Sequence, residues 1–149
     1  MKNEENSPDR GATRSRAFAT TVLMVATFMD LMDSTITNVA LPTIGKDLHA
    51  TPEQLEWTLA GYVIAFATLL LTGGRLGDVF GHRRIFVIGM VGFTLASLGA
   101  ALSQTGDLLV AARMLQGGFA GIMVPQVLSS VQVMFAPEER APVLGIIGA

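Results

Sequence analysis

Four long apolar runs, separated by short polar or charged segments, dominate this chain of 149 residues. They cover about 18–41, 55–72, 85–103 and 108–135, and each is near the roughly 20 apolar residues that a helix needs to cross a bilayer. Only 15% of the residues are charged, against about a quarter in soluble domains. The pattern predicts an all-α membrane protein with four complete transmembrane helices.

The polar ends of the chain frame these runs. Residues 1–16 mix basic and acidic side chains with little apolar content, so we expect a disordered cytoplasmic tail there. A partial transmembrane domain, 17–149, follows. After the polar loop 136–141, we expect residues 141–149 to start a fifth helix that is too short to cross. Pro125 predicts a kink in the fourth run.

Lysine and arginine gather in the segments that four crossings would bring to one side of the membrane. The other side receives only Lys46. Because basic loops stay in the cytoplasm, we predict a multi-pass protein of the cell membrane with a cytoplasmic N-terminus. The residues that give this bias are Lys2, Arg10, Arg14, Arg16, Arg75, Arg83, Arg84 and Arg140.

The first run carries two carboxylates, Asp30 and Asp33, one helical turn apart. A charge at membrane depth costs about 2.5–3.5 kcal/mol on insertion scales, so such residues face a cavity or a partner and often handle protons. We predict this role for both, the alternative being that one bonds only to backbone or hydroxyl groups of a neighbouring helix. Other polar residues extend the same stripe: Thr27, Ser34, Thr37 and Asn38.

The fourth run contains a lone cation, Arg113, five residues from its outer end. Asp33 lies eight residues before Leu41, the outer end of the first run. With a helical rise of about 1.5 Å per residue, both side chains lie at a similar depth. We therefore expect an Asp33–Arg113 pair, direct or through water. The alternative is an arginine whose head extends to the outer headgroups.

The residue inventory argues against an enzyme. Cysteine is absent, and His49 and His82 both lie beside charged segments, so we expect neither a metal site nor a catalytic cluster. The glycine-rich segment 73–84 reads as a charged loop between two helices. It lacks the sequence GxxxxGK[ST] and follows no strand, which argues against nucleotide binding. We expect the lipid bilayer as a partner, and no nucleic acid.

Small residues recur at helical spacing along the third and fourth runs. In lipid, where apolar burial does not drive association, such stripes allow helices to approach closely. We interpret them as packing faces rather than ligand sites. They comprise Gly89, Gly92, Ala96, Gly99 and Ser103 on the third run, and Gly117, Ala120 and Gly121 on the fourth.

Four segments carry a family resemblance. Residues 33–42 read DSTITNVALP, 74–84 read GRLGDVFGHRR, and 113–117 read RMLQG, followed by Pro125. These segments resemble motifs of the major facilitator superfamily. The first resembles its helix-1 motif LDxTIVNVALP, the second its helix 2–3 loop motif GxLaDrxGrkr, and the third its helix-4 motif. The fourth segment, Glu139-Arg140 before an apolar run, resembles the loop that enters helix 5. The helix-1 segment resembles more narrowly its fourteen-helix drug:proton antiporter branch.

The resemblance implies part of the N-terminal six-helix half of a major facilitator fold. It also implies efflux of drugs or other small organic compounds, with the proton gradient as energy source and no cofactor. Proton-coupling or cavity roles would fall on Asp33, Asp30, Arg113, Asn38 and Gln116, although Asp30 lies outside the motif and its role depends on its burial. A conformational latch would involve Gly74, Asp78, Gly81, Arg83 and Arg84.

Three residues depart from the motifs of the family, and two other functions stay open. Val79 and His82 stand where the loop motif is usually basic, and Phe119 stands where the helix-4 motif often has glycine. A metabolite uptake symporter fragment, or a short non-transporting membrane partner or regulator, stays open. Because alternating access needs two repeats, we expect this chain alone to be inactive, whether it is a natural truncation or an incomplete sequence. Twelve and fourteen helices both stay open for a complete transporter, as does its oligomeric state.

Overall fold

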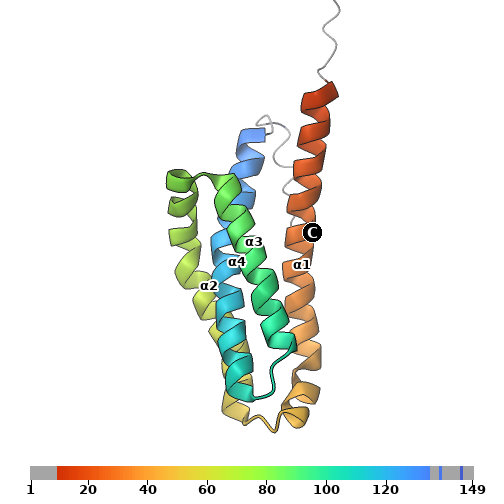
Figure 1. Ribbon diagram of the computed structural model, residues 1–149, viewed down its shortest axis with the longest axis vertical. Coiled ribbons are helices and arrows are strands. Elements are labelled where there is room, and N and C mark those ends of the chain that lie inside the picture. The colour runs from red at the N-terminus through yellow and green to blue at the C-terminus, as the bar shows by residue number, and fades with distance from the viewer. Residues whose placement is uncertain (1–9, 135–137, 139–144, 146–149) are drawn as a thin grey trace, which may run out of the picture.

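The structure is a computed structural model that describes residues 10–134 together with Glu138 and Gly145. Residues 10–134 form four α-helices and no strand, which confirms the all-α prediction for this part. The helices run alternately up and down, with the α2–α3 connection at one end of the bundle and the other two connections at the opposite end (Figure 1). Their bounds are α1 Arg10–Asp47, α2 Pro52–Phe80, α3 His82–Ala101 and α4 Gly106–Met134.

Over the part of the chain whose side chains are described, helices α2, α3 and α4 are each long and apolar enough to cross a membrane. Helix α1, with 38 residues, is the longest, but the side chains of its first part lie outside the described residues. The predicted count of four crossings therefore depends on α1, whose residues Asp30 and Asp33 are bonded to neighbouring helices.

Helix α1 extends past both ends of the predicted span 18–41. Arg10–Arg16 lie in α1, so the predicted disordered tail is wrong for these residues; residues 1–9 lie outside the described part. This segment contains no proline, and lengthening an existing helix costs far less than starting one. At the other end α1 continues through Pro42 to Asp47. Proline removes one backbone hydrogen bond, which a long membrane helix tolerates.

The segment 73–84, predicted to be a loop, is almost entirely helical. Helix α2 continues to Phe80 and α3 begins at His82, so Gly81 alone joins them. Gly81 has φ 92°, in the left-handed region that favours glycine, and its N–H donates to the Gly77 carbonyl oxygen at 2.9 Å. The loop prediction is wrong because one glycine completes the turn, and the charged side chains lie on helix ends.

The predicted spans 55–72, 85–103 and 108–135 each correspond to one helix, and each helix begins two or three residues earlier than predicted. Helix α4 is continuous through Pro125. The loop 136–141 and the start of a fifth helix at 141–149 lie outside the described residues, apart from Glu138 and Gly145.

Side chains fix the helix starts at the end of the bundle opposite Gly81. The Thr51 hydroxyl accepts from the N–H of Gln54, and the Thr51 N–H donates to Oε1 of Gln54, a capping box with Pro52 at the first helical position. Nε2 of Gln54 donates to Asp107 at 2.7 Å. This bond ties the start of α2 to the start of α4.

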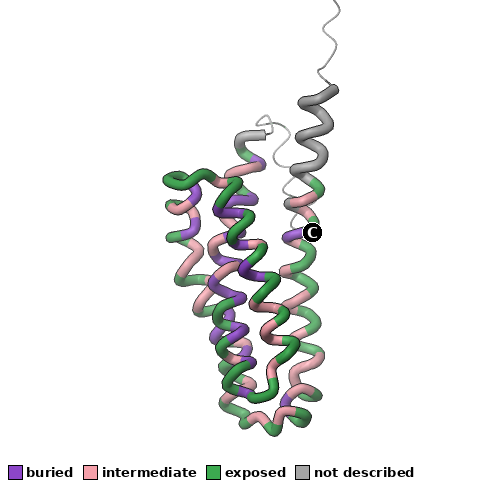
Figure 2. Tube along the Cα trace, viewed as in Figure 1, coloured by how far each residue is buried: buried purple, intermediate pink, exposed green. Residues whose placement is uncertain are grey.

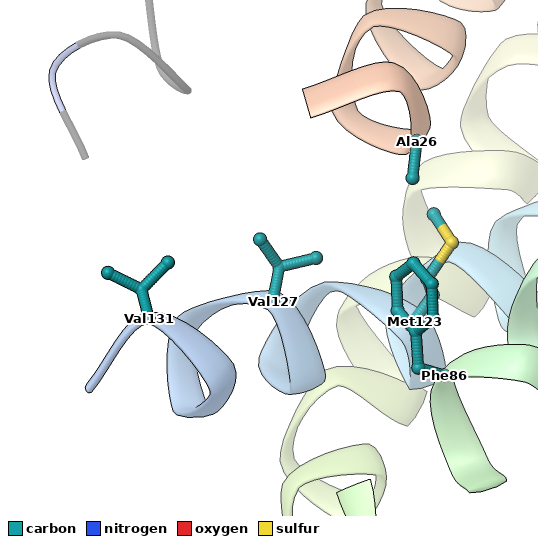
Figure 3. Packing of buried hydrophobic residues seen from close by; sticks show 5 residues of the cluster. All are labelled: Ala26, Phe86, Met123, Val127 and Val131. Carbon is teal, nitrogen blue, oxygen red and sulfur yellow. The ribbon is translucent and has the colours of Figure 1, made fainter. Parts of the chain in front are cut away.

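Helix α4 forms the centre of the bundle. Helices α2 and α3 pack closely along it, whereas α1 contacts the others sparsely, and buried residues are concentrated on α4 (Figure 2). One apolar cluster joins α1, α3 and α4 and consists of Ala26, Phe86, Met123, Val127 and Val131 (Figure 3). A second joins α2, α3 and α4 and consists of Tyr62, Phe93 and Ala120.

Small residues allow these close approaches. Cβ atoms added at Gly117 and Gly121 would collide with backbone carbonyl oxygens of α2. On α3, a Cβ at Gly92 would lie 2.6 Å from Cγ of Phe119. The glycines therefore serve packing, as their spacing predicts. Gly92 also makes room for Phe119, the bulky residue at a position where the resembled motif often has glycine.

We expect Gly117→Ala to lower the free energy of unfolding by about 1–3 kcal/mol, the range for overpacked cores. The added methyl group would meet the Tyr62 carbonyl oxygen, which is backbone and cannot rotate away. Thermal unfolding in detergent measures the loss. Gly99→Ala is the matched control, because its Cβ would lie 3.9 Å from that of Ala112 and alanine favours helix. Equal losses in the two variants would contradict the close approach of α2 and α4.

Candidate functional site

An ion pair joins α1 to α4 inside the apolar part of the bundle. Nη1 of Arg113 donates to Oδ2 of Asp33 at 2.5 Å and to Oε1 of Gln116 at 2.8 Å. Nε2 of Gln116 donates in turn to Oδ1 of Asp33 at 2.7 Å. Arg113 and Gln116 are neighbours on one face of α4 because they are three residues apart. We call Asp33, Arg113 and Gln116 the polar triad.

The polar triad is nearly enclosed by protein. Gln116 is fully buried, and the side chains of Arg113 and Asp33 are 4% and 18% exposed. Removing two charges from water is costly unless their geometry is good and further hydrogen bonds satisfy them. Here each oxygen of Asp33 accepts one bond. The contact is direct, and it contradicts the alternative of an arginine that extends to the headgroups.

Tyr62 of α2 connects the polar triad to the second carboxylate. Its hydroxyl donates to Oδ1 of Asp30 at 2.5 Å, and the guanidinium carbon of Arg113 lies 4.4 Å from its ring centroid, a cation–π contact. The observed partner of Asp30 is thus a hydroxyl group of a neighbouring helix. This contact agrees with the alternative in which one of the two aspartates bonds to such a group. Sequence reasoning missed Tyr62, although a lone tyrosine within an apolar run needs a partner for its hydroxyl.

A cavity of about 240 Å³ adjoins the polar triad, all three members of which line it. Residues of α1, α3 and α4 and Thr58 of α2 form the remaining wall, which is mostly apolar or small. Asn38 does not line it: its Nδ2 donates to the Ser34 carbonyl oxygen at 2.9 Å on the exposed side of α1. The structure therefore brings together Asp33, Arg113 and Gln116, with Asp30 attached through Tyr62, and leaves Asn38 apart.

The α2–α3 junction holds a second polar network. Nε2 of Gln126 donates to the carbonyl oxygens of Gly73 at 2.7 Å and Ile122 at 3.0 Å. Its Oε1 therefore faces His82, whose Nδ1 is 2.7 Å away and must carry the hydrogen. Nε2 of His82 lies 3.5 Å from Asp78. A histidine at a usually basic position thus links the junction to α4.

The five residues predicted for a latch all lie at or beside this junction but have different surroundings. Asp78 faces the imidazole, Gly81 makes the turn, and Gly74 lies on α2 near α4. Arg83 and Arg84, at the start of α3, are exposed, and neither forms an ion pair with a side chain that the structure describes. Their role in a latch stays a prediction.

Gln126, which sequence reasoning missed, is fully buried on α4. The signal that could have revealed it is an amide directly after Pro125 in an otherwise apolar run, since a buried amide requires partners. Over the described part of the chain, no group of three or more His, Cys, Asp or Glu side chains could hold a metal ion.

A helical bundle with a polar triad at membrane depth fits the motifs that resemble a transporter family. Residues 23–149 match the Major Facilitator Superfamily. The chain belongs to this family. It is therefore a multi-pass membrane protein of a transporter family, not an enzyme, and the family resemblance is confirmed.

Several Major Facilitator Superfamily relatives are described as resistance or export proteins. A probable actinorhodin transporter of Streptomyces coelicolor is 45% identical over 127 residues, which are 85% of this chain and 22% of that protein. A puromycin resistance protein of Streptomyces alboniger is 39% identical over 147 residues, which are 97% of this chain and 29% of that protein. A tetracenomycin C resistance and export protein of Streptomyces glaucescens is 41% identical over 130 residues, which are 87% of this chain and 23% of that protein. The chain spans less than a third of the length of each.

Exchanging the two charges tests the direct contact between Asp33 and Arg113. Each single variant, Asp33→Arg or Arg113→Asp, leaves a buried charge unpaired and is expected to cost about 3–5 kcal/mol of unfolding free energy. The double variant should recover about 1–3 kcal/mol of this loss, measured by thermal unfolding in detergent. Glu56→Gln, which removes an exposed charge, is the control and should change little. A double variant no more stable than either single variant would exclude direct pairing.

Proposed function

We propose that the chain is the N-terminal part of a proton-coupled exporter of drugs or other small organic compounds in the cell membrane. The polar triad beside its cavity carries this proposal, because an ionisable group at membrane depth is typical of a proton or substrate pathway. Relatives described as a puromycin resistance protein and a tetracenomycin C resistance and export protein support export. The proton gradient supplies the energy, and no cofactor is needed.

In this proposal Asp33 binds the transported proton. The ionised carboxylate balances Arg113 and attaches α1 to α4 through the polar triad. A proton on Asp33 removes its charge, so the attraction between the two helices falls sharply in a site with little water. A substrate in the adjoining cavity meets the same side chains, which makes proton binding and substrate binding sensitive to each other.

Alternating access needs a second repeat that moves against the first. The α2–α3 junction supplies half of a latch for this motion: Asp78, Arg83 and Arg84 offer charged groups, while Gly74 and Gly81 fix the shape of the turn. Their partners belong to the other half of a complete transporter. Four helices make less than one repeat, so transport is proposed for the complete protein and not for this chain alone.

We further propose that α1 is a fourth membrane crossing with a cytoplasmic N-terminus. The start of α1 and the α2–α3 junction lie at the same end of the bundle (Figure 1). Both carry several arginines, whereas the two connections at the opposite end contain one lysine, Lys46, and no arginine. This distribution is typical of a cytoplasmic face.

Labelling of single cysteines tests the orientation, because the chain has no native cysteine. Val79→Cys at the α2–α3 junction and Leu102→Cys after α3 form a matched pair, with native side chains that are 75% and 67% exposed. In intact cells a membrane-impermeant maleimide should label Leu102→Cys and leave Val79→Cys unlabelled until the cells are opened. The reverse pattern would overturn the proposed orientation.

Drug accumulation tests the function in the complete protein, provided that the reading frame continues past codon 149. Cells expressing it should accumulate less of a fluorescent cationic dye than cells without it, and an uncoupler should abolish the difference. Asp33→Asn should raise accumulation to the level of cells without the protein, while Glu56→Gln, at an exposed position, should not. Full activity of Asp33→Asn would contradict the coupling role. Increased uptake of a metabolite would favour a symporter, and a genuine stop codon would favour a partner or regulator.

A further inference from the structure

Asp30 lies outside the polar triad, yet it shares the same apolar depth. It is half-buried one turn before Asp33, and its observed partner is the neutral hydroxyl of Tyr62. Among the side chains that the structure describes, none forms an ion pair with Asp30. The hydroxyl donates one hydrogen bond to Asp30 but leaves the charge of an ionised carboxylate unbalanced.

Tyr62 holds Asp30 close to the charge of Arg113. The hydroxyl end of the ring binds Asp30, and the ring face carries the guanidinium at 4.4 Å. The side chain itself is buried and stacked on Phe66, with ring centroids 6.3 Å apart, which restricts its movement. Asp30 and Arg113 therefore both contact the same buried aromatic side chain.

Arg113 has an unused donor. Nη1 serves both Asp33 and Gln116, but Nε is buried and has no partner among the described residues. A buried donor without an acceptor is unfavourable. The guanidinium can thus accommodate one more acceptor, and Asp30 is the second carboxylate on the adjoining part of α1.

We propose that Asp30 is the alternative counter-ion of Arg113, and that Arg113 exchanges Asp33 for Asp30 when Asp33 binds a proton. The proton comes from water and ends on a carboxylate oxygen of Asp33, while Arg113 keeps its charge. The two carboxylates and the arginine then change from net −1 to neutral, with Asp30 balancing Arg113. Tyr62 is a positioning residue that holds Asp30 ready. The exchange depends on the proposed function.

The surroundings of Asp33 are consistent with this exchange. Helix α4 faces it with Arg113 and Gln116, α2 contributes the phenol of Tyr62, and α1 contributes Asp30 itself. The α3 residues that line the cavity, such as Ser97, carry no charge. Among these described groups, Asp30 is thus the carboxylate left to balance Arg113 once Asp33 is neutral.

Thermal unfolding of the chain in detergent provides the first test, because Asp33→Asn mimics the protonated carboxylate. Asp33→Asn should fold and lose little stability, since Arg113 moves to Asp30. Asp30→Asn combined with Asp33→Asn leaves Arg113 without a carboxylate, and its midpoint should fall below the sum of the single effects by about 5 °C or more. Additive effects, or an Asp33→Asn variant that does not fold, would overturn the exchange.

The pH profile of dye transport by the complete protein provides the second test. Asp30→Asn and Tyr62→Phe should both shift the profile, and Asp30→Glu should restore it. If Asp30 and Tyr62 had only a structural role, these variants would lower transport by the same factor at every pH. Phe28→Leu is the control, because it changes an exposed aromatic side chain of α1 that takes no part in the network. If Asp33→Asn abolishes transport while Asp30→Asn leaves the profile unchanged, the exchange alone fails. If the unaltered protein does not transport, the proposed function fails and the unfolding test still decides the exchange.

Discussion

An arginine enclosed in an apolar bundle requires a counter-charge, and the attachment of α1 depends on meeting that requirement. Helices α2 and α3 pack on α4 through glycines that bring backbones together. Over its described residues, helix α1 joins the others near Ala26, near Gly45 and through its two carboxylates. Close packing therefore holds α2, α3 and α4 together, and charged side chains supply an important part of the attachment of α1. In the proposed function, this is the helix whose attachment a proton on Asp33 would weaken.

The length of the apolar runs predicted where helices cross lipid, but not where they end. Hydropathy reports the depth of a residue, and a helix continues beyond the apolar layer wherever its backbone bonds can still form. For that reason Arg10–Arg16 and most of segment 73–84 are helical despite their charge. The glycines in that segment read as a loop signal, although only Gly81 adopts a conformation that requires glycine.

The site was predictable to the extent that it obeys simple geometry. Asp33 and Arg113 could be paired because the helical rise gives the depth of each charge in its own run. Tyr62 and Gln126 could not be placed, because a neutral polar residue in an apolar run gives no sign of which neighbour its helix face meets. That information comes from the rotation of packed helices, which small residues on both partners set together.

The single-residue joint at Gly81 has a mechanical consequence. A long loop would let one helix move without the other, but here a single residue joins Phe80 to His82. The Gln126 amide also binds Gly73 of α2 and His82 of α3, and so attaches both helices to α4. Because α2 and α3 both bind the same buried amide of α4, we expect a displacement of the start of α3 to move all three helices together.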